Sequence, residues 1–468
     1  MNKTLLAAAL AISLAGCSML PEYLRPTAPV PAAWQDNVGG AFQGGSWQAY
    51  FPDPRLQALI KTALENNRDL RIATARINEA RAQYGLQKAD QLPNLNLAAA
   101  RNASFTPAGA SVTGMPISTQ RYDVGISLVS FELDFWGRVA SLSEAAKANF
   151  FSTEAAQRAF RLSLIADVAN AYLSLLEINE RTELASDTVR TRGETRQLTS
   201  RRRDVGVSGD LDLLLADGAY QAALAERANL QRQQALASNL LGLLVGRTMA
   251  EMKDLPAGRS LALQDIRADL MAGLPAEVLL QRPDVLAAEQ KLIAANANIG
   301  AARAAFLPRI TLTGGMGTAS GSLAGLFDGG SRAWNFQPAL TLPLFDAGRT
   351  SALVDIAAAR KVIAVAEYEK TIQQAFREVA DLLSARDKLA EQLAAQQANA
   401  QAQSRRQILV EARYKAGIGN QLEVLDAQRE LFAAQQGALQ VQRTLLATAT
   451  QLYKALAGQE NAPPEAGK

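Results

Sequence analysis

The sequence predicts a mainly α-helical membrane protein that also contains four β-strands, with one architecture written twice in the chain. Three observations predict this fold class: an internal repeat, two pairs of short segments in which apolar and polar residues alternate, and two helical segments far longer than a globular domain needs. In each half we expect a helix, two strands, a long helix and a returning helix, in that order.

The repeat aligns residues 69–97 with residues 284–312 without a gap. Shared residues within this stretch include Asp69 and Asp284, Gly85 and Gly300, and Pro93 and Pro308. Later matches keep the same order: Gly137-Arg138 with Gly348-Arg349, Gly206-Val207 with Gly417-Ile418, and Leu-x-Gly at Leu244 and Leu456. An ordered series of this length indicates a tandem duplication.

The repeat sets the expected boundaries. Residues 1–16 form a signal peptide, with Lys3 at its positive end and an apolar stretch from Leu5 to Leu14. Residues 17–52 form an N-terminal segment, 53–248 the first repeat, 249–272 a linker, 273–458 the second repeat and 459–468 a tail.

The run Leu14-Ala15-Gly16-Cys17 resembles a bacterial lipobox, in which Cys17 would carry a covalent lipid. Ser18 follows, where outer-membrane lipoproteins usually lack aspartate, so this resemblance points to the outer membrane. An ordinary cleavage site with an incidental cysteine is the alternative. Because Cys17 is the only cysteine in 468 residues, a disulfide within the chain is excluded.

The first half opens with a predicted helix from about Asp53 to Asp90, which ends before Pro93. Strand candidates then flank a Gly/Ser/Thr/Pro-rich loop, at 106–119 here and at 320–331 in the second half. Val124, Ile126 and Leu128 alternate with polar or small residues, and so do residues from Trp334 to Leu344. A phase slip between Leu128 and Phe131 indicates a bulge, and Pro338 and Pro343 count against a central strand.

After Gly137 and Gly348 the apolar period changes to that of a helix. Ile165, Val168, Tyr172 and Leu175 follow a coiled-coil spacing, and the pattern runs from Arg138 to about Arg203 and again from Arg349 to about Lys415. Roughly 65 residues at about 1.5 Å each would give a rod of roughly 100 Å. Closely spaced glycines at 204–210 and 416–420 should reverse the chain, with Asp210 and Asn420 capping the returning helices.

Composition excludes several classes of function. The chain has no histidine, and its one cysteine belongs to the lipobox, which removes Ser/His and Cys/His nucleophiles and histidine-ligated metals. We therefore predict no enzyme, no catalytic residues, no metal and no cofactor beyond the lipid on Cys17. The 48 Lys+Arg residues nearly balance 45 Asp+Glu residues, so no basic field for nucleic acid is present.

Four amphipathic strands cannot span a bilayer alone, because open edges would leave backbone groups unpaired in hydrocarbon. Closure needs further copies of the chain. Two chains would give eight strands and three would give twelve, and periodicity alone does not choose between them.

Motifs throughout the mature chain carry a family resemblance: residues 21–26 leading to Trp34, Phe135-Trp136-Gly137-Arg138, Leu344 to Arg349, Leu274 to Asp284, and Tyr414 to Gln428. In these the chain resembles TolC-type outer-membrane factors, most closely their lipidated, OprM-like branch. The resemblance implies a homotrimer with a twelve-stranded outer-membrane β-barrel continued by a long α-helical periplasmic barrel. It also implies an equatorial layer from residues 17–52, 249–272 and the tail.

The same resemblance implies function. The expected role is a passive exit duct of a tripartite efflux pump that conducts drugs and other small toxic compounds. Its partners would be a periplasmic adaptor (membrane fusion) protein and an inner-membrane transporter of the resistance-nodulation-division type. A duct for type I protein secretion is the nearest alternative, and a non-conducting structural or adaptor lipoprotein is an alternative of another class.

Leu422 and Asp426 match the family's periplasmic aperture positions, and Glu423 matches a carboxylate position in some members. Three copies would form a hydrophobic ring and a carboxylate ring, whose crowding should favour cation binding or raise the pKa of Asp426. A coiled-coil seam residue at Leu422 and a solvated acid at Asp426 are the plainer alternatives. Gly419 stands where relatives often carry an arginine, which puts any closing link through that arginine in doubt.

The hairpin tips Gly206-Val207 and Gly417-Ile418 match the turns on which family members meet the adaptor. Exposed backbone and small apolar side chains suit insertion into a partner's helical grooves. A tight turn without a partner would explain the glycines equally well.

Overall fold

The computed structural model describes residues 18–31, 46–252, 254–266 and 276–456. The predicted signal peptide, the lipid site Cys17 and the tail 459–468 lie outside the described residues. The chain forms two compact units. Of the described residues, the sheet unit holds those within 18–27, 76–154 and 287–369, and the hairpin unit holds those within 28–75, 155–286 and 370–456. Each unit draws on both repeats.

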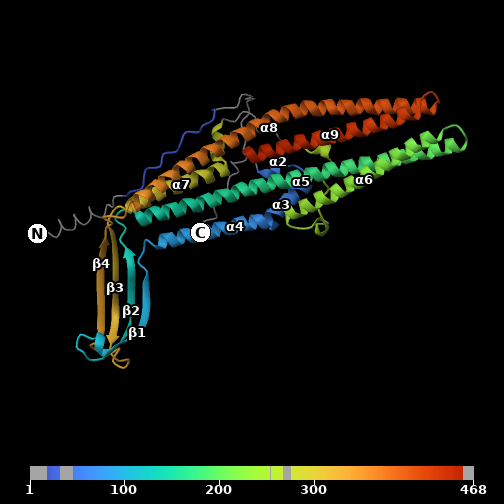
Figure 1. The fold of residues 1–468 in the computed structure, drawn as a ribbon. Coiled ribbons are helices and arrows are strands. Elements are labelled where there is room, and N and C mark those ends of the chain that lie inside the picture. Colours follow the sequence, from blue (N-terminus) through green and yellow to red (C-terminus); the bar gives the residue numbers. More distant parts are fainter. Residues whose placement is uncertain (1–17, 32–45, 253, 267–275, 457–468) are drawn as a thin grey trace. The chain divides into compact units, whose positions relative to one another are not determined.

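The sheet unit contains one antiparallel sheet of four strands in the order β1-β2-β3-β4 (Figure 1). The strands are β1 (Leu95–Thr106), β2 (Ile117–Glu132), β3 (Arg309–Ser320) and β4 (Arg332–Thr341). The predicted strand pairs and both loops are confirmed. The predicted bulge is confirmed too, since the β2–β3 register shifts between Leu128 and Phe131 and Ser130 has a φ of 54°.

The two prolines of the second half act differently from each other. Pro338 lies within β4 opposite Leu312, so this position has no N–H to donate, yet the pairing of β4 with β3 continues on both sides of it. Pro343 ends the pairing instead. The expectation that the strand runs on to Leu344 is therefore wrong, because β4 stops at Thr341.

Helices α5 (Arg138–Asp204) and α7 (Pro283–Ala304) contact each other within the sheet unit through alanines. Ala145 and Ala148 of α5 are buried with Ala294 and Ala297 of α7, and Ile293 packs against them. Such small side chains allow the two backbones to lie close together. A cation–π contact from Arg81 to Phe150 joins α4 (Arg68–Ala89) to α5.

The predicted first helix is broken in two, α3 (Pro54–Asn66) and α4, which corrects the expectation of one helix from Asp53 to Asp90. Asn67 causes the break. Its backbone is extended, its side-chain oxygen accepts from the N–H of Leu70 at 2.9 Å, and its amide donates to the carbonyl of Leu244 at 2.8 Å. Asn67 therefore starts α4 and holds the end of another helix.

Two helical hairpins account for most of the hairpin unit (Figure 1). In the first, α5 returns as α6 (Asp210–Val245), and in the second, α8 (Arg349–Lys415) returns as α9 (Gln421–Leu456). These bounds confirm the predicted long helices and reversals. Asn420 caps α9 by accepting from the N–H of Glu423 at 2.8 Å, as predicted, but Asp210 is no cap, since Gly209 precedes α6 without a side-chain bond.

The core of the hairpin unit follows the predicted seam of α5. Ile165, Val168 and Tyr172 are buried, and Leu175 is half-buried. This helix contains an 18-residue window of mean hydropathy 1.3, but half of that window is buried inside the fold, as in a core helix. Short elements complete the unit: α2 (Trp47–Tyr50), η2 (Met249–Glu251), η3 (Leu261–Leu263) and η5 (Ala276–Gln281).

A buried carboxylate ties the predicted linker to this core. Asp53 caps α3 through the N–H of Arg55 at 2.8 Å, and the same side chain accepts from the Tyr172 hydroxyl and from the N–H of Arg259, each at 3.0 Å. Gln264 adds a fourth bond at 2.5 Å. Burial alone would raise the pKa of Asp53, but the bonds from Gln264 and from the N–H groups of Arg259, Arg55 and Leu56 outweigh it and lower the pKa.

Candidate functional site

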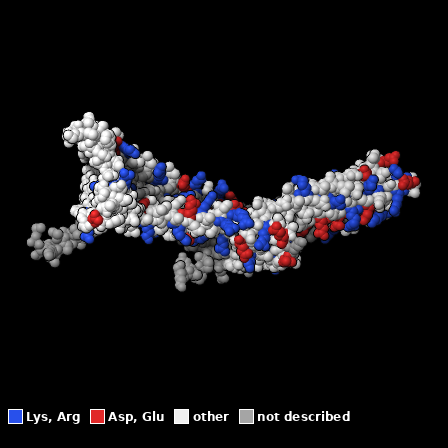
Figure 2. Space-filling model, turned by 90° about the horizontal axis from the view of Figure 1, so that it is seen from below, with Lys and Arg blue, Asp and Glu red and all other residues white. Residues whose placement is uncertain are grey.

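The two faces of the sheet carry different side chains. One row of directly paired residues has large, exposed side chains, Leu97-Ile126-Met316-Trp334. The next row has only alanine and glycine, Ala98-Gly125-Gly317-Ala333, and we call it the minimal row. Phe105, Phe336 and Leu340 extend the apolar face. The opposite face bears Asn96, Arg121, Asp123, Ser127 and Asn335. Figure 2 shows few charged atoms over the sheet and many of both signs along the helices.

The minimal row brings the β2 and β3 backbones close together. A Cβ at Gly317 would lie 2.1 Å from the carbonyl oxygen of Val124, and one at Gly125 would lie 2.6 Å from that of Met316. Glycine is therefore required at both positions. Together with the bulge, this pair lets the sheet twist and curve, as a barrel wall must.

The strands meet the helices at a bonded junction. Trp136 donates to the carbonyl of Pro308 at 2.8 Å, and Arg138 forms two bonds of 2.7 Å to Glu132, which Arg309 also contacts at 2.7 Å. These contacts explain the tryptophan and the arginine of the Phe-Trp-Gly-Arg motif. Phe135, Phe306 and Phe345 are exposed near the same strand ends. Aromatic residues at strand ends are typical of membrane interfaces.

Asp426 is clamped between two arginines of its own chain. Arg406 of α8 donates to Oδ2 at 2.6 Å, and Arg429 of α9 donates to Oδ1 at 2.6 Å. The bond from Arg406, aided by the charge of Arg429, lowers the pKa of Asp426. The expected rise is thus not what one subunit shows, because each copy supplies its own counter-charges.

The other residues predicted to line the aperture lie on the same helix. Leu422 is 62% exposed one turn before Asp426, so the two share a face of α9. Glu423 is half-buried and lies in the first turn, where Asn420 holds its N–H. Gly419 packs tightly against Arg413 and Tyr414, with its would-be Cβ 3.1 Å from the Tyr414 nitrogen.

The two predicted tips have the same geometry. Gly206 and Gly417 both have a φ of 78°, the left-handed region that favours glycine. Each turn closes with two backbone bonds, from Gly206 to Arg203 and Val207 to Arg202, and from Gly417 to Tyr414 and Ile418 to Arg413. Val207 and Ile418 are 65% and 70% exposed. Both tips therefore present an apolar side chain beside bare backbone.

Sequence reasoning missed the partners that hold these sites. Arg429 could have been found from its i+3 spacing to Asp426. Arg406 lies on the other helix of the hairpin, so predicting its contact with Asp426 requires the register of α8 against α9. The link between the hairpins was also missed. Arg202 stacks over the ring of Tyr414 at 4.9 Å, and buried Gln421 donates to the carbonyl of Asp212 at 3.1 Å.

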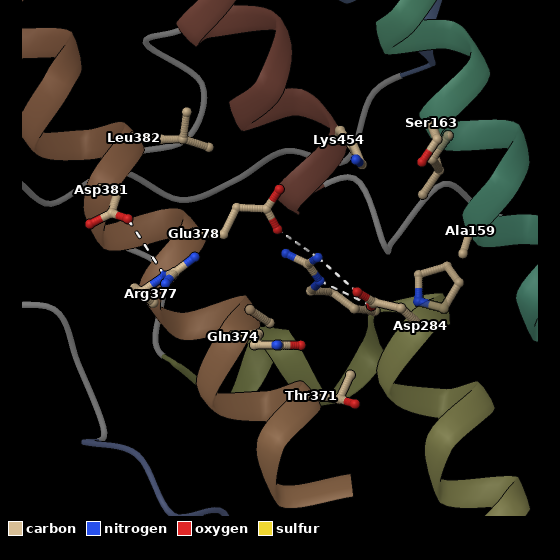
Figure 3. A pocket seen from close by; sticks show the side chains of 14 residues that line it. Ala159, Ser163, Asp284, Thr371, Gln374, Arg377, Glu378, Asp381, Leu382 and Lys454 are labelled. Carbon is tan, nitrogen blue, oxygen red and sulfur yellow. Dashed lines mark hydrogen bonds and ion pairs between the residues drawn. The ribbon is translucent and has the colours of Figure 1, made fainter. Parts of the chain in front are cut away.

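A cavity of about 540 Å³ lies in the hairpin unit where α9 ends and α7 begins (Figure 3). Buried Arg282 forms its wall and donates to Asp284 at 2.8 Å, to Glu378 at 2.9 Å and to the carbonyl of Ala455 at 3.0 Å. Burial would raise the pKa of Asp284, but the bonds from Arg282 lower it. Among the described residues no His/Cys/Asp/Glu cluster could hold a metal ion. Arg282 is thus paired with Asp284 and Glu378, and Arg377 with Asp381.

Comparisons with known proteins agree on one family. The model of the family "Outer membrane efflux protein" matches residues 59–247 and 274–458. The chain is 43% identical over 459 residues to outer membrane protein OprJ of Pseudomonas aeruginosa, covering 96% of this chain and 94% of OprJ. It is 42% identical over 472 residues to the probable efflux pump outer membrane protein TtgC of Pseudomonas putida, with 98% and 96% covered.

A solved channel has the same fold. The open state of the Neisseria gonorrhoeae MtrE outer membrane channel is similar with a TM-score of 0.87 and 38% identity, covering 95% of this chain and 99% of that one. The resemblance to TolC-type factors is confirmed. The chain therefore belongs to the outer membrane efflux protein family, as a channel of the outer membrane with helices that extend into the periplasm.

Proposed function

We propose that three copies of this chain form a duct that passively conducts drugs and other small toxic compounds out of the periplasm and catalyses nothing. The observation that carries the proposal is the sheet: four strands, one exposed apolar face, and free outer edges on β1 and β4. In lipid each free edge must be paired, so β4 of one copy pairs with β1 of the next. Three copies supply twelve strands, enough to leave a lumen behind the small and polar face.

The relatives support efflux rather than protein secretion. TtgC is named as an efflux pump component, and OprJ as an outer membrane protein. By the same likeness the duct works with a periplasmic adaptor and an inner-membrane transporter of the resistance-nodulation-division type. The tips Val207 and Ile418 are the contact points for the adaptor, because their exposed apolar side chains flank unobstructed glycine backbone.

Leu422 and Asp426 form the periplasmic aperture in this proposal. Three copies of Leu422 make an apolar ring that resists hydration, and three copies of Asp426 make an acidic ring one turn away. The clamp by Arg406 and Arg429 ties α9 to α8 inside each subunit. Opening requires α9 to shift against α8, so the clamp favours the closed state. Cys17 carries the lipid that holds the subunit at the outer membrane.

Gene deletion and reconstitution test the proposal together. Cells that lack the chain should become sensitive to small toxic compounds, and the purified chain should conduct ions in planar bilayers. Unchanged drug sensitivity with loss of an exported protein would favour a type I secretion duct. Absence of conductance from a membrane-inserted protein would contradict a duct of either kind.

A further inference from the structure

The first described residues run along α7 as a strap, Ser18–Arg25, inside the sheet unit. Ser18 lies 3.6 Å from the position a Cβ at Gly137 would take, and the N–H of Met19 donates to the carbonyl of Trp136 at 3.4 Å. The strap thus begins beside the strand–helix junction. From there it follows α7 toward that helix's N-terminus.

A buried carboxylate holds the far end of the strap. Glu289 of α7 is only 6% exposed and accepts from the Tyr23 hydroxyl at 3.1 Å and from Arg25 Nε at 2.6 Å, with a second bond from Arg25 Nη2. Burial and the charge of Glu289 both raise the pKa of Tyr23, so the phenol remains a donor. Truncating one partner of such a buried pair leaves the other charge uncompensated.

The middle of the strap sits in a notch that requires glycine. Asn296 donates to the carbonyl of Pro21 at 2.8 Å. One turn further along α7, a Cβ at Gly300 would lie 2.9 Å from the Cα of Leu20 and 2.7 Å from Ser141 Oγ. At Gly85, the matching glycine of the first repeat, nothing lies within 4 Å. Only the second repeat therefore receives the strap.

We propose that this strap positions the lipid anchor, with Glu289 and Gly300 as the residues that fix it. Docking places Ser18, the residue that follows the predicted attachment point, beside the junction where β2 and β3 meet the helices. A lipid attached next to Ser18 would enter the membrane beside the exposed aromatic residues of the junction. An undocked strap would leave the sheet tethered by a long flexible segment, at a lower effective concentration for insertion.

This inference rests on lipidation of Cys17, part of the proposed function, but not on export of any substrate. The measurement is a pulse–chase of conversion of new chains to an SDS-resistant oligomer in the outer membrane. Gly300→Ala should slow conversion on the order of tenfold, because effective concentration falls with roughly the three-halves power of tether length. Glu289→Gln should slow conversion as well, since it weakens the other contact of the strap.

Matched controls separate positioning from packing. Gly85→Ala, the same change in the first repeat, and Glu144→Gln, at an exposed ion pair of the same unit, should convert at the wild-type rate. In a Cys17→Ala chain exported behind an ordinary signal peptide, Gly300→Ala should cause no further delay. Purified variants should keep wild-type helical circular dichroism.

Two results would overturn the inference: wild-type conversion by lipidated Gly300→Ala, or an equal delay with and without the lipid. The second would assign Gly300 to packing alone. Failure of the duct proposal looks different. In that case conversion still depends on the strap, but the assembled oligomer conducts nothing.

Discussion

The two helical hairpins turn in the same way but carry different chemistry just beyond the turn. Counting from the tip glycines, Leu422 of the second hairpin corresponds to Leu211 of the first, whereas Asp426 corresponds to Leu215. Among the described residues, the return helix of the second hairpin is capped by Asn420 and holds Asp426 between Arg406 and Arg429, whereas α6 has no side-chain cap. The two repeats thus share the turn, which needs one left-handed glycine, but at the position nine residues beyond it the second repeat has an aspartate and the first a leucine.

The same division appears where each returning helix ends. Asn67 of the first repeat binds the carbonyl of Leu244, and Arg282, its counterpart, binds that of Ala455. Arg282 also bridges Asp284 and Glu378. We call these two contacts joints. The joint at Asn67 is therefore neutral and the joint at Arg282 is charged, although each holds the end of a returning helix.

Breaking the clamp should have the largest effect and should be confined to the second hairpin. Asp426→Ala removes the anion shared by Arg406 and Arg429 in every copy of the proposed trimer, so α9 is freed from α8. We expect single-channel conductance in planar bilayers to rise several-fold. Leu215→Ala, at the matching position of the first hairpin, should leave conductance unchanged. Equal effects of the two substitutions would mean that the hairpins share the gate.

The two joints should differ in stability. Arg282→Gln loses charge-assisted bonds and should lower the free energy of unfolding by about 2 kcal/mol, whereas Asn67→Ala loses neutral bonds and should cost about 1 kcal/mol. Thermal unfolding of both variants in detergent measures this difference. A larger loss for Asn67→Ala would contradict the ranking.

Acid should release only the hairpin that carries the clamp. The pKa of Asp426 is lowered from its usual 3.8, so the clamp contributes fully above that value and is lost as pH falls through the lowered pKa. Conductance should stay level from neutral pH to about pH 4 and rise only below it. If conductance rose near pH 6 instead, crowding of carboxylates would dominate over the arginines.

The cap at Asn420 should have the smallest and most local effect. Asn420→Ala removes the bond to the N–H of Glu423 and should cost about 1 kcal/mol in the first turn of α9. Hydrogen exchange there should quicken, while the first turn of α6, which has no side-chain cap, keeps its rate. If Asn420→Ala quickened hydrogen exchange in the first turns of both α6 and α9, the two tips would unfold together, which would contradict a local effect.

Sequence patterns predicted the helices and strands well because each of them occurs in both repeats, so two independent stretches of sequence led to the same prediction. The strands, the bulge at Leu128 and the long helices all follow from local periodicity. The break at Asn67 was missed because asparagine interrupts a helix only when its side chain finds partners, and its partner, Leu244, is distant in sequence. The bond from Arg406 to Asp426 and the bond from Arg25 to Glu289 were missed for the same reason.

The number of chains that close the sheet tests the central claim most directly. Native mass spectrometry of the lipidated protein, extracted from outer membranes in mild detergent, should give a complex of three chains, and the same preparation should form ion-conducting pores. A monomer, or a dimer whose eight strands leave no lumen, would contradict the account.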